Sequence, residues 1–102
     1  MSNKTFGSSN DWVKKYFYIQ EGVLFKFKER GSKCQAKYPL YKSKLVEYQP
    51  NIYNGTAFQI NLEDNRSIVL KTDDQMETQT WINAILRQRL LINEIIDSIE
   101  YD

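Results

Sequence analysis

The most regular pattern in this chain begins at Glu77-Thr78-Gln79-Thr80-Trp81-Ile82-Asn83-Ala84-Ile85. From Trp81 onward, apolar residues recur at spacings that keep them on one face of a helix: Ala84, Ile85, Ile92, Ile95, Ile96 and Ile99. No Gly or Pro follows Gly55, and the segment Thr72-Asp73-Asp74-Gln75 offers side chains that cap a helix start, with Gln75 able to return a bond. The pattern therefore predicts one long helix over about residues 73–99.

The residues before this helix predict a body of short antiparallel strands. Runs of aromatic and β-branched residues are separated by turn residues such as Gln20-Glu21-Gly22 and Asn54-Gly55. Strands with an open edge or mouth need a cover, and Trp81 and Ile85 are predicted to provide it. The fold class is therefore α+β, mainly β, with the strands within about residues 1–71. The individual strands are expected at residues 12–19, 23–28, 36–41, 45–48, 57–62 and 67–71, with a seventh short strand at the N-terminus.

Alternation along the first hairpin assigns side chains to the two faces of its sheet. Lys15 shares a face with Phe17, and on the returning strand Lys26 shares a face with Leu24. Phe25 lies on the other side. Both lysines are therefore expected next to apolar residues of the same face.

Length and composition limit the function classes. At 102 residues, the chain is predicted to form one domain, residues 1–102. It has no histidine and only one cysteine, Cys34, which excludes Ser-His and Cys-His nucleophile pairs, His-ligated zinc and internal disulfides. The acid pairs Glu63-Asp64 and Asp73-Asp74 fit a turn and a helix start. We therefore expect no enzymatic activity, no cofactor and no metal site, in a soluble protein of a reducing compartment.

Positive charge is concentrated in the first half of the chain. Residues 1–50 contain ten Lys or Arg and four acids, whereas residues 51–102 contain four Lys or Arg and nine acids. This asymmetry predicts an electrically polarised molecule that faces an anionic partner, unless the two halves interleave in space and the polarity vanishes. Nucleic acid is the weaker choice of partner, because the basic strand lacks Arg and the net charge is only +1.

Several segments, taken in order, resemble a known family. Trp12-Val13-Lys14-Lys15-Tyr16-Phe17-Tyr18-Ile19, Gly22-Val23-Leu24-Phe25-Lys26-Phe27 and Trp81-Ile82-Asn83-Ala84-Ile85 are similar to the second strand, third strand and closing helix of the pleckstrin homology (PH) domain. The resemblance extends from about Lys4 to Leu86. It implies a partly open barrel of seven antiparallel strands in two nearly orthogonal sheets, with one end capped by the long C-terminal helix.

The resemblance also implies a binding site. In many PH domains, the loops that join strands one to two, three to four and six to seven surround a basic pocket at the open end. This pocket holds the phosphates of a phosphoinositide head group. Lys4 matches the lysine of the first strand, Lys15 matches the last basic position of the second strand, and Lys26 takes a position where many members place a phosphate-contacting Tyr. Val13 replaces the other basic residue of that motif, which puts strict recognition of one head group in doubt. Further basic residues, chiefly Lys14, Lys28 and Lys37, are expected to surround this mouth, and Phe6 is expected to insert into the membrane.

The leading hypothesis is a module that binds anionic phospholipid head groups, either phosphoinositide or phosphatidic acid, between the loops of strands one to two and three to four. It would act in the cytoplasm, at the periphery of a membrane. The alternative hypothesis is a PH-like module that binds a protein through its helix tail or a sheet edge. The tail favours this alternative because its apolar residues project beyond so small a body, and it is predicted to pack back on the barrel or to pair with another helix. The residues concerned are Leu91, Ile92, Ile95, Ile96 and Ile99.

Overall fold

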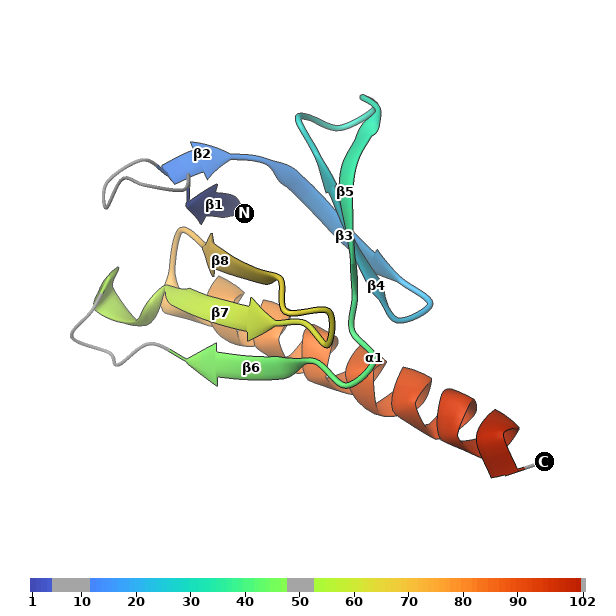
Figure 1. The fold of residues 1–102 in the computed structure, drawn as a ribbon. Helices are drawn as coiled ribbons and strands as arrows, with labels where there is room; N and C mark the ends of the chain where they lie inside the picture. The colour runs from blue at the N-terminus through green and yellow to red at the C-terminus, as the bar shows by residue number, and fades with distance from the viewer. Residues whose placement is uncertain (5–11, 48–52, 102) are drawn as a thin grey trace.

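A computed structural model of the chain describes residues 1–4, 12–47 and 53–101. These residues form two antiparallel sheets and one long helix, as predicted (Figure 1). The elements, in chain order, are β1 (Ser2–Lys4), β2 (Trp12–Lys14), β3 (Tyr16–Gln20), β4 (Val23–Phe27), β5 (Cys34–Pro39), β6 (Lys44–Glu47), the short 3₁₀ helix η1 (Tyr53–Gly55), β7 (Ala57–Asn61), β8 (Ser67–Lys71) and α1 (Gln75–Tyr101).

The two sheets are joined by a strand that bends at Lys15. One sheet has the strand order β2-β1-β8-β7-β6, and the other has the order β3-β4-β5. Only Lys15 separates β2 from β3, and its N–H donates to the carbonyl of Met1 over 2.8 Å. The strand predicted over residues 12–19 is therefore one continuous path that passes from the first sheet to the second (Figure 1). When its two halves are counted together, the described residues contain the seven predicted strands.

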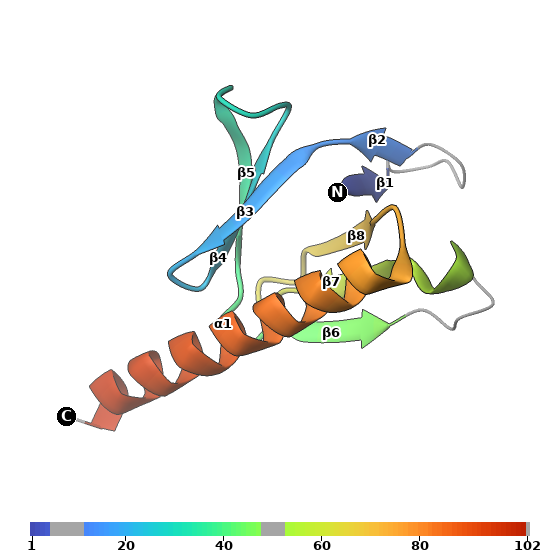
Figure 2. The same ribbon diagram turned by 180° about the vertical axis from the view of Figure 1, so that it is seen from behind.

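The core lies between the two sheets and under the first half of α1. Leu24 of β4, Phe58 of β7 and Leu70 of β8 are fully buried in it. From α1, Ile82 and Ile85 enter this core with 3% and 1% of their surfaces exposed, whereas Trp81 packs against its margin and is only partly buried. Figure 2 shows α1 lying across the body and continuing past both sheets toward the C-terminus.

The start of α1 is capped by an Asp side chain of the expected segment, although a different residue returns the bond. Asp74 accepts a hydrogen bond from the N–H of Glu77 over 2.7 Å, and the Glu77 carboxylate accepts one from the N–H of Asp73 over 3.4 Å. This reciprocal arrangement satisfies two backbone donors near the helix start. Gln75, which was expected to return the bond, instead donates to the carbonyl of Asn54 over 2.7 Å.

The second half of α1 is attached to the turn between β3 and β4. Gly22 has a φ of +77°, and its N–H donates to Oε1 of Gln88 over 2.9 Å. A Cβ added at Gly22 would lie 2.7 Å from Cβ of Ile92, so the turn and the helix approach as closely as glycine allows. Further along, Asn93 accepts a bond from the N–H of Lys42. The tail thus packs back on the barrel along one side, which is one of the two arrangements predicted for it.

Candidate anion-binding mouth of the barrel

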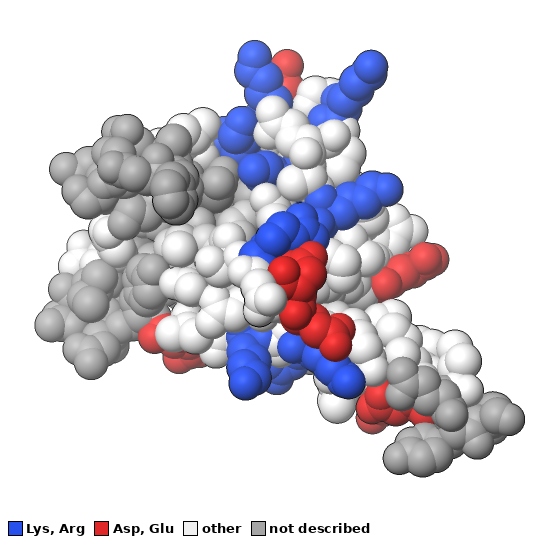
Figure 3. All heavy atoms as spheres, in the orientation of Figure 1, with Lys and Arg blue, Asp and Glu red and all other residues white. Residues whose placement is uncertain are grey.

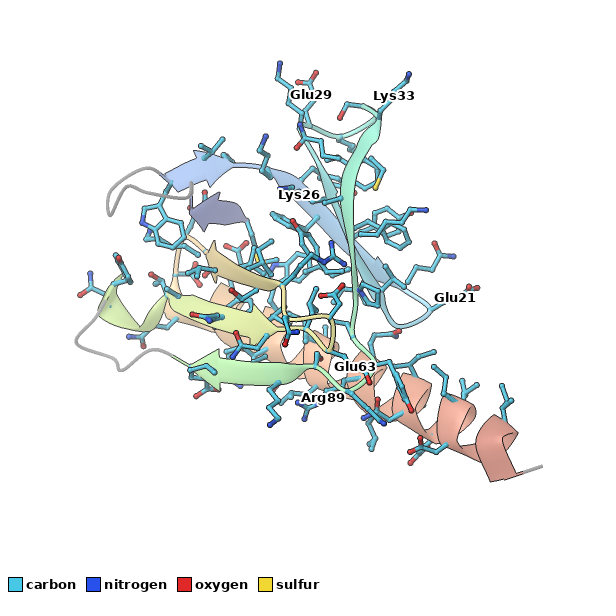
Figure 4. The ribbon with its side chains drawn as sticks, viewed as in Figure 1. Glu21, Lys26, Glu29, Lys33, Glu63 and Arg89 are labelled. Carbon is cyan, nitrogen blue, oxygen red and sulfur yellow. The ribbon has the colours of Figure 1, made fainter. Side chains whose placement is uncertain are left out.

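Lys26 lies on the inner side of the three-stranded sheet, near the open end of the barrel (Figure 4). It shares the inner face of β4 with Leu24, which is fully buried, and it pairs across the sheet with Phe17 and Ala36. Nζ of Lys26 lies 5.9 Å from the centre of the Tyr38 ring. Tyr38 is itself buried, with 8% of its surface exposed, so the ammonium group is held against a fixed aromatic face.

Arg66 approaches the same ring from the turn between β7 and β8. Its Cζ lies 5.6 Å from the Tyr38 ring centre, and its Nη2 donates to the carbonyl of Lys37 over 3.2 Å. Nε of Arg66 forms a salt bridge of 2.8 Å with Asp64, whose other carboxylate oxygen accepts the Arg66 N–H over 3.0 Å. This backbone bond, followed by the side-chain bond and charge of Arg66, lowers the pKa of Asp64. The guanidinium group is therefore fixed beside the ring that also holds Lys26.

Lys15 is the other predicted contact residue of the first hairpin. It is partly buried at the bend between β2 and β3, two residues before Phe17, which pairs with Lys26. Among the described residues, neither Lys15 nor Lys26 forms a salt bridge, because the single ion pair found there joins Arg66 to Asp64. We refer to Lys15, Lys26 and Arg66 together as the mouth cluster.

The structure describes the side chains of three further predicted contact residues, Lys14, Lys28 and Lys37. Lys37 lies on the outer face of the three-stranded sheet, with Nζ 5.9 Å from the Phe25 ring, because Tyr38 takes the inward position on β5. Lys14 and Lys28 are exposed, and Lys4 contributes its backbone to β1. The Lys4 side chain and Phe6 lie outside the described part of the structure.

Arg66 is not among the site residues predicted from the sequence. Its position in the sequence could have indicated it, because Arg66 lies in the turn between the last two strands. This turn, between β7 and β8, corresponds to the loop between strands six and seven of the family, one of the three loops implied to border the pocket. Its proximity to Tyr38 depends on how the two sheets approach each other, and no local pattern in the sequence reports that.

Charge is only partly segregated on the surface. In the view of Figure 3, Lys and Arg side chains gather over β2 and around the loop between β4 and β5. Basic side chains also appear along the lower edge, near β6 and α1, close to acidic ones. Glu29 and Lys33 project together from the tip of the β4–β5 loop, away from the barrel (Figure 4). The basic first half of the chain therefore forms a positive region at the open end, while some of its lysines interleave with the acidic second half.

The described residues contain neither a metal-ligand group nor a membrane-spanning helix. They contain no group of three or more His, Cys, Asp or Glu side chains positioned to hold a metal ion. Within the same ranges, no helix is both long enough and apolar enough to cross a bilayer.

Comparison with known proteins identifies the family. The family model described as the PH domain matches residues 1–89. The chain belongs to the PH domain family. PH domains are generally non-enzymatic modules, and they often bind phosphoinositides or proteins at membrane surfaces. No curated protein matches the chain significantly.

Solved PH domains share this fold. The PH domain of human oxysterol binding protein-related protein 11 matches with a TM-score of 0.80 and 18% identity, covering 93% of this chain and 81% of the other. The PH domain of the human KIAA0053 protein matches with a TM-score of 0.72 and 22% identity, covering 86% of this chain and 82% of the other. The C-terminal PH domain of pleckstrin gives a TM-score of 0.71 at 18% identity, with 86% and 91% covered. At these identities the likeness concerns the fold alone.

Proposed function

We propose that this PH domain binds the head groups of anionic phospholipids, phosphoinositide or phosphatidic acid, with the mouth cluster, and so brings the protein that carries it to the cytoplasmic face of a membrane. The observation that supports this proposal is that Lys26 and Arg66 both lie against the Tyr38 ring, at 5.9 Å and 5.6 Å from its centre. The first-strand lysine, Lys4, is proposed as a further contact on the strength of the family resemblance.

The chemistry of a phosphate group supports this assignment. A phosphomonoester carries close to two negative charges, so a site for it needs several cations held at low entropy cost. Lys26 projects from β4, and Arg66 is held by Asp64 and the Lys37 carbonyl, so these two side chains lose little freedom when an anion binds. The ammonium groups of Lys15 and Lys26 have no carboxylate to exchange for the ligand among the described residues.

The same residues suggest modest discrimination among head groups. Val13 occupies the motif position where many phosphoinositide-binding members have a basic residue, and its side chain is 42% exposed. Basic residues near an anionic membrane contribute on the order of 1 kcal/mol each, whichever head group carries the charge. We therefore expect binding that depends on charge and salt and shows at most a limited preference for one lipid.

Vesicle flotation tests the proposal. Neutral vesicles are compared with vesicles of equal charge that contain phosphatidylserine, phosphatidic acid or a single phosphoinositide, at low and physiological salt. The sharpest variant pair is Lys26→Ala and Lys37→Ala, because both remove one charge from the same sheet but on opposite faces. We expect Lys26→Ala combined with Arg66→Ala to weaken binding about 30-fold, since about 2 kcal/mol is lost. Equal losses for Lys26→Ala and Lys37→Ala would reduce the site to a diffuse basic surface, and absence of binding to every vesicle would refute the proposal.

A second candidate function is supported by the helix tail. Its apolar side chains remain exposed, Leu91 by 46%, Ile95 by 56% and Ile99 by 68%, whereas Ile92 and Ile96 are partly buried. The family model ends at residue 89, so these positions lie outside the matched range. Exposed apolar residues in such a row are typical of a surface that contacts another protein. We propose that this PH domain also contacts a helical partner through the tail.

A further inference from the structure

The exposed side of α1 carries a regular seam. Ala84, Gln88, Leu91 and Ile95 follow one another at intervals of four, three and four residues, which is the spacing of a helix that packs along another helix. Ala84, Leu91 and Ile95 are exposed, and Gln88 is partly buried because it accepts the bond from Gly22. We call these four residues the tail seam.

Two hollows lie beside the tail seam. The first is lined by Ile19 of β3 together with Ala84 and Gln88. The second is lined by Gly22 together with Gln88, Leu91 and Ile95, so Gln88 borders both hollows. The short side chain of Ala84 leaves room at one end of the seam, while Ile95 projects at the other end. One surface therefore presents both a hollow and a residue large enough to fill it.

The tail seam is flanked by one positive and one negative side chain, one near each of its ends. Arg87 and Glu94 lie seven residues apart on the same flank of the helix, and both are exposed. Within the described part of the chain, neither side chain has a hydrogen-bond or ion-pair partner. Arg87 lies near Ala84, and Glu94 lies beside Ile95. A helix of the same sequence running in the opposite direction would place Glu94 opposite Arg87 and Ile95 opposite Ala84.

From this reciprocity we infer that the occupant of the tail seam is a second copy of this chain, with the two α1 helices antiparallel. In this register Gln88 faces Leu91 of the second copy, and each Arg87 pairs with Glu94 of the other chain, so the two-fold axis produces the ion pair twice. In a parallel pair, each residue would lie beside the same residue of the second chain. Arg87 would then face Arg87 and Glu94 would face Glu94, so neither would meet a side chain of opposite charge. The inference rests on the second candidate function, the helical contact through the tail, and names its partner.

Charge exchange tests both the contact and its direction. The intact chain is followed by sedimentation equilibrium over a concentration series, with Arg87→Glu, Glu94→Arg and the double variant Arg87→Glu/Glu94→Arg. Each single exchange turns two attractive pairs into two repulsive ones, so the dimer should weaken about tenfold, and the double variant should restore it. Arg87 and Glu94 are both exposed, so these substitutions are expected to leave the fold intact. Thermal unfolding of each variant checks that they do.

Cross-linking gives an independent readout of direction. In a Cys34→Ser background, the Ala84→Cys and Ile95→Cys variants are mixed under oxidising conditions. The antiparallel register predicts that the mixed disulfide between the two variants dominates over either disulfide between identical variants. A parallel pair would instead give the Ile95→Cys protein linked to itself, and this result would overturn the inference.

The outcomes separate this inference from the proposed lipid binding. Protein that stays monomeric throughout the concentration series, or a dimer that is insensitive to the charge exchanges, overturns the second-copy inference even if vesicle flotation succeeds. A dimer that floats with no vesicle retains the inference and refutes the lipid proposal. The Lys26→Ala/Arg66→Ala variant serves as the control, because it should weaken vesicle binding and keep the dimer.

Discussion

The contact between Gly22 and Ile92 should be measurable as stability. A methyl group added at Gly22 would meet Cβ of Ile92 at 2.7 Å and its Cγ1 at 2.8 Å, which are distances that side-chain carbons do not adopt without movement. The backbone at Gly22 also has a φ of +77°, a conformation that disfavours any residue with a Cβ. Gly22→Ala therefore combines a conformational cost with a steric cost.

Gly31 separates these two costs. Its φ is +86°, and a Cβ added there meets no atom within 4 Å. Gly31→Ala should therefore lose only the conformational part, about 1–2 kcal/mol of the free energy of unfolding. Gly22→Ala should lose this amount plus about 1–3 kcal/mol for the forced displacement of the turn or of α1. The expected difference between the two variants is thus about 1–3 kcal/mol.

Urea unfolding followed by tryptophan fluorescence measures both variants against the unmodified chain, and the slope with denaturant shows whether unfolding remains comparable. Hydrogen exchange then locates the effect, because displacement of the turn should expose the amide of Gly22, which donates to Gln88. If Gly22→Ala loses no more stability than Gly31→Ala, the turn does not approach the helix as described. The attachment of the tail to the barrel would then be wrong.

Two further predictions concern the ends of α1 and β8. Asp74→Ala should cost about 1 kcal/mol more than Asp73→Ala in the free energy of unfolding, because only Asp74 accepts the helix-start N–H with its side chain; equal losses would contradict the cap. Arg66→Gln should raise the pKa of Asp64 toward its ordinary value, because the Arg66 side chain contributes to lowering it, and NMR titration of the carboxyl group measures this. The lowered pKa means that the contribution of the pair to stability is complete above the ordinary pKa of Asp64 and is lost as the pH falls through the folded value. An Asp64 pKa unchanged by Arg66→Gln would exclude the side-chain contribution.

The sequence was sufficient for the order and type of the elements because their signals are local. Alternation of apolar residues marks the strands, and the absence of Gly and Pro after Gly55 leaves α1 uninterrupted through Tyr101. Alternation also placed Lys26 correctly on the face of Leu24. Each of these inferences needs only neighbours along the chain.

The features that the sequence did not reveal depend on contacts between distant segments. The bend at Lys15 arises where its backbone pairs with Met1, and no residue at the bend marks it. Whether Gln75 or Glu77 closes the helix cap depends on Asn54, which lies near enough to receive the Gln75 amide. The place of Arg66 beside Tyr38 requires the β7–β8 turn to meet the three-stranded sheet. Such contacts depend on tertiary packing, and local sequence patterns carry no information about it.

The mouth cluster and the tail seam involve different residues, so their free energies should be independent. A dimer would nevertheless bring two mouth clusters to one membrane, and the second binding event would then be intramolecular whenever both mouths reach the same surface. This gain requires no improvement of either site. The gain is set by the ratio of the effective concentration of the second mouth to the dissociation constant of a single site. A charge exchange at Arg87, which is not part of the mouth cluster, should therefore lower vesicle affinity only at protein concentrations where the unmodified chain is dimeric.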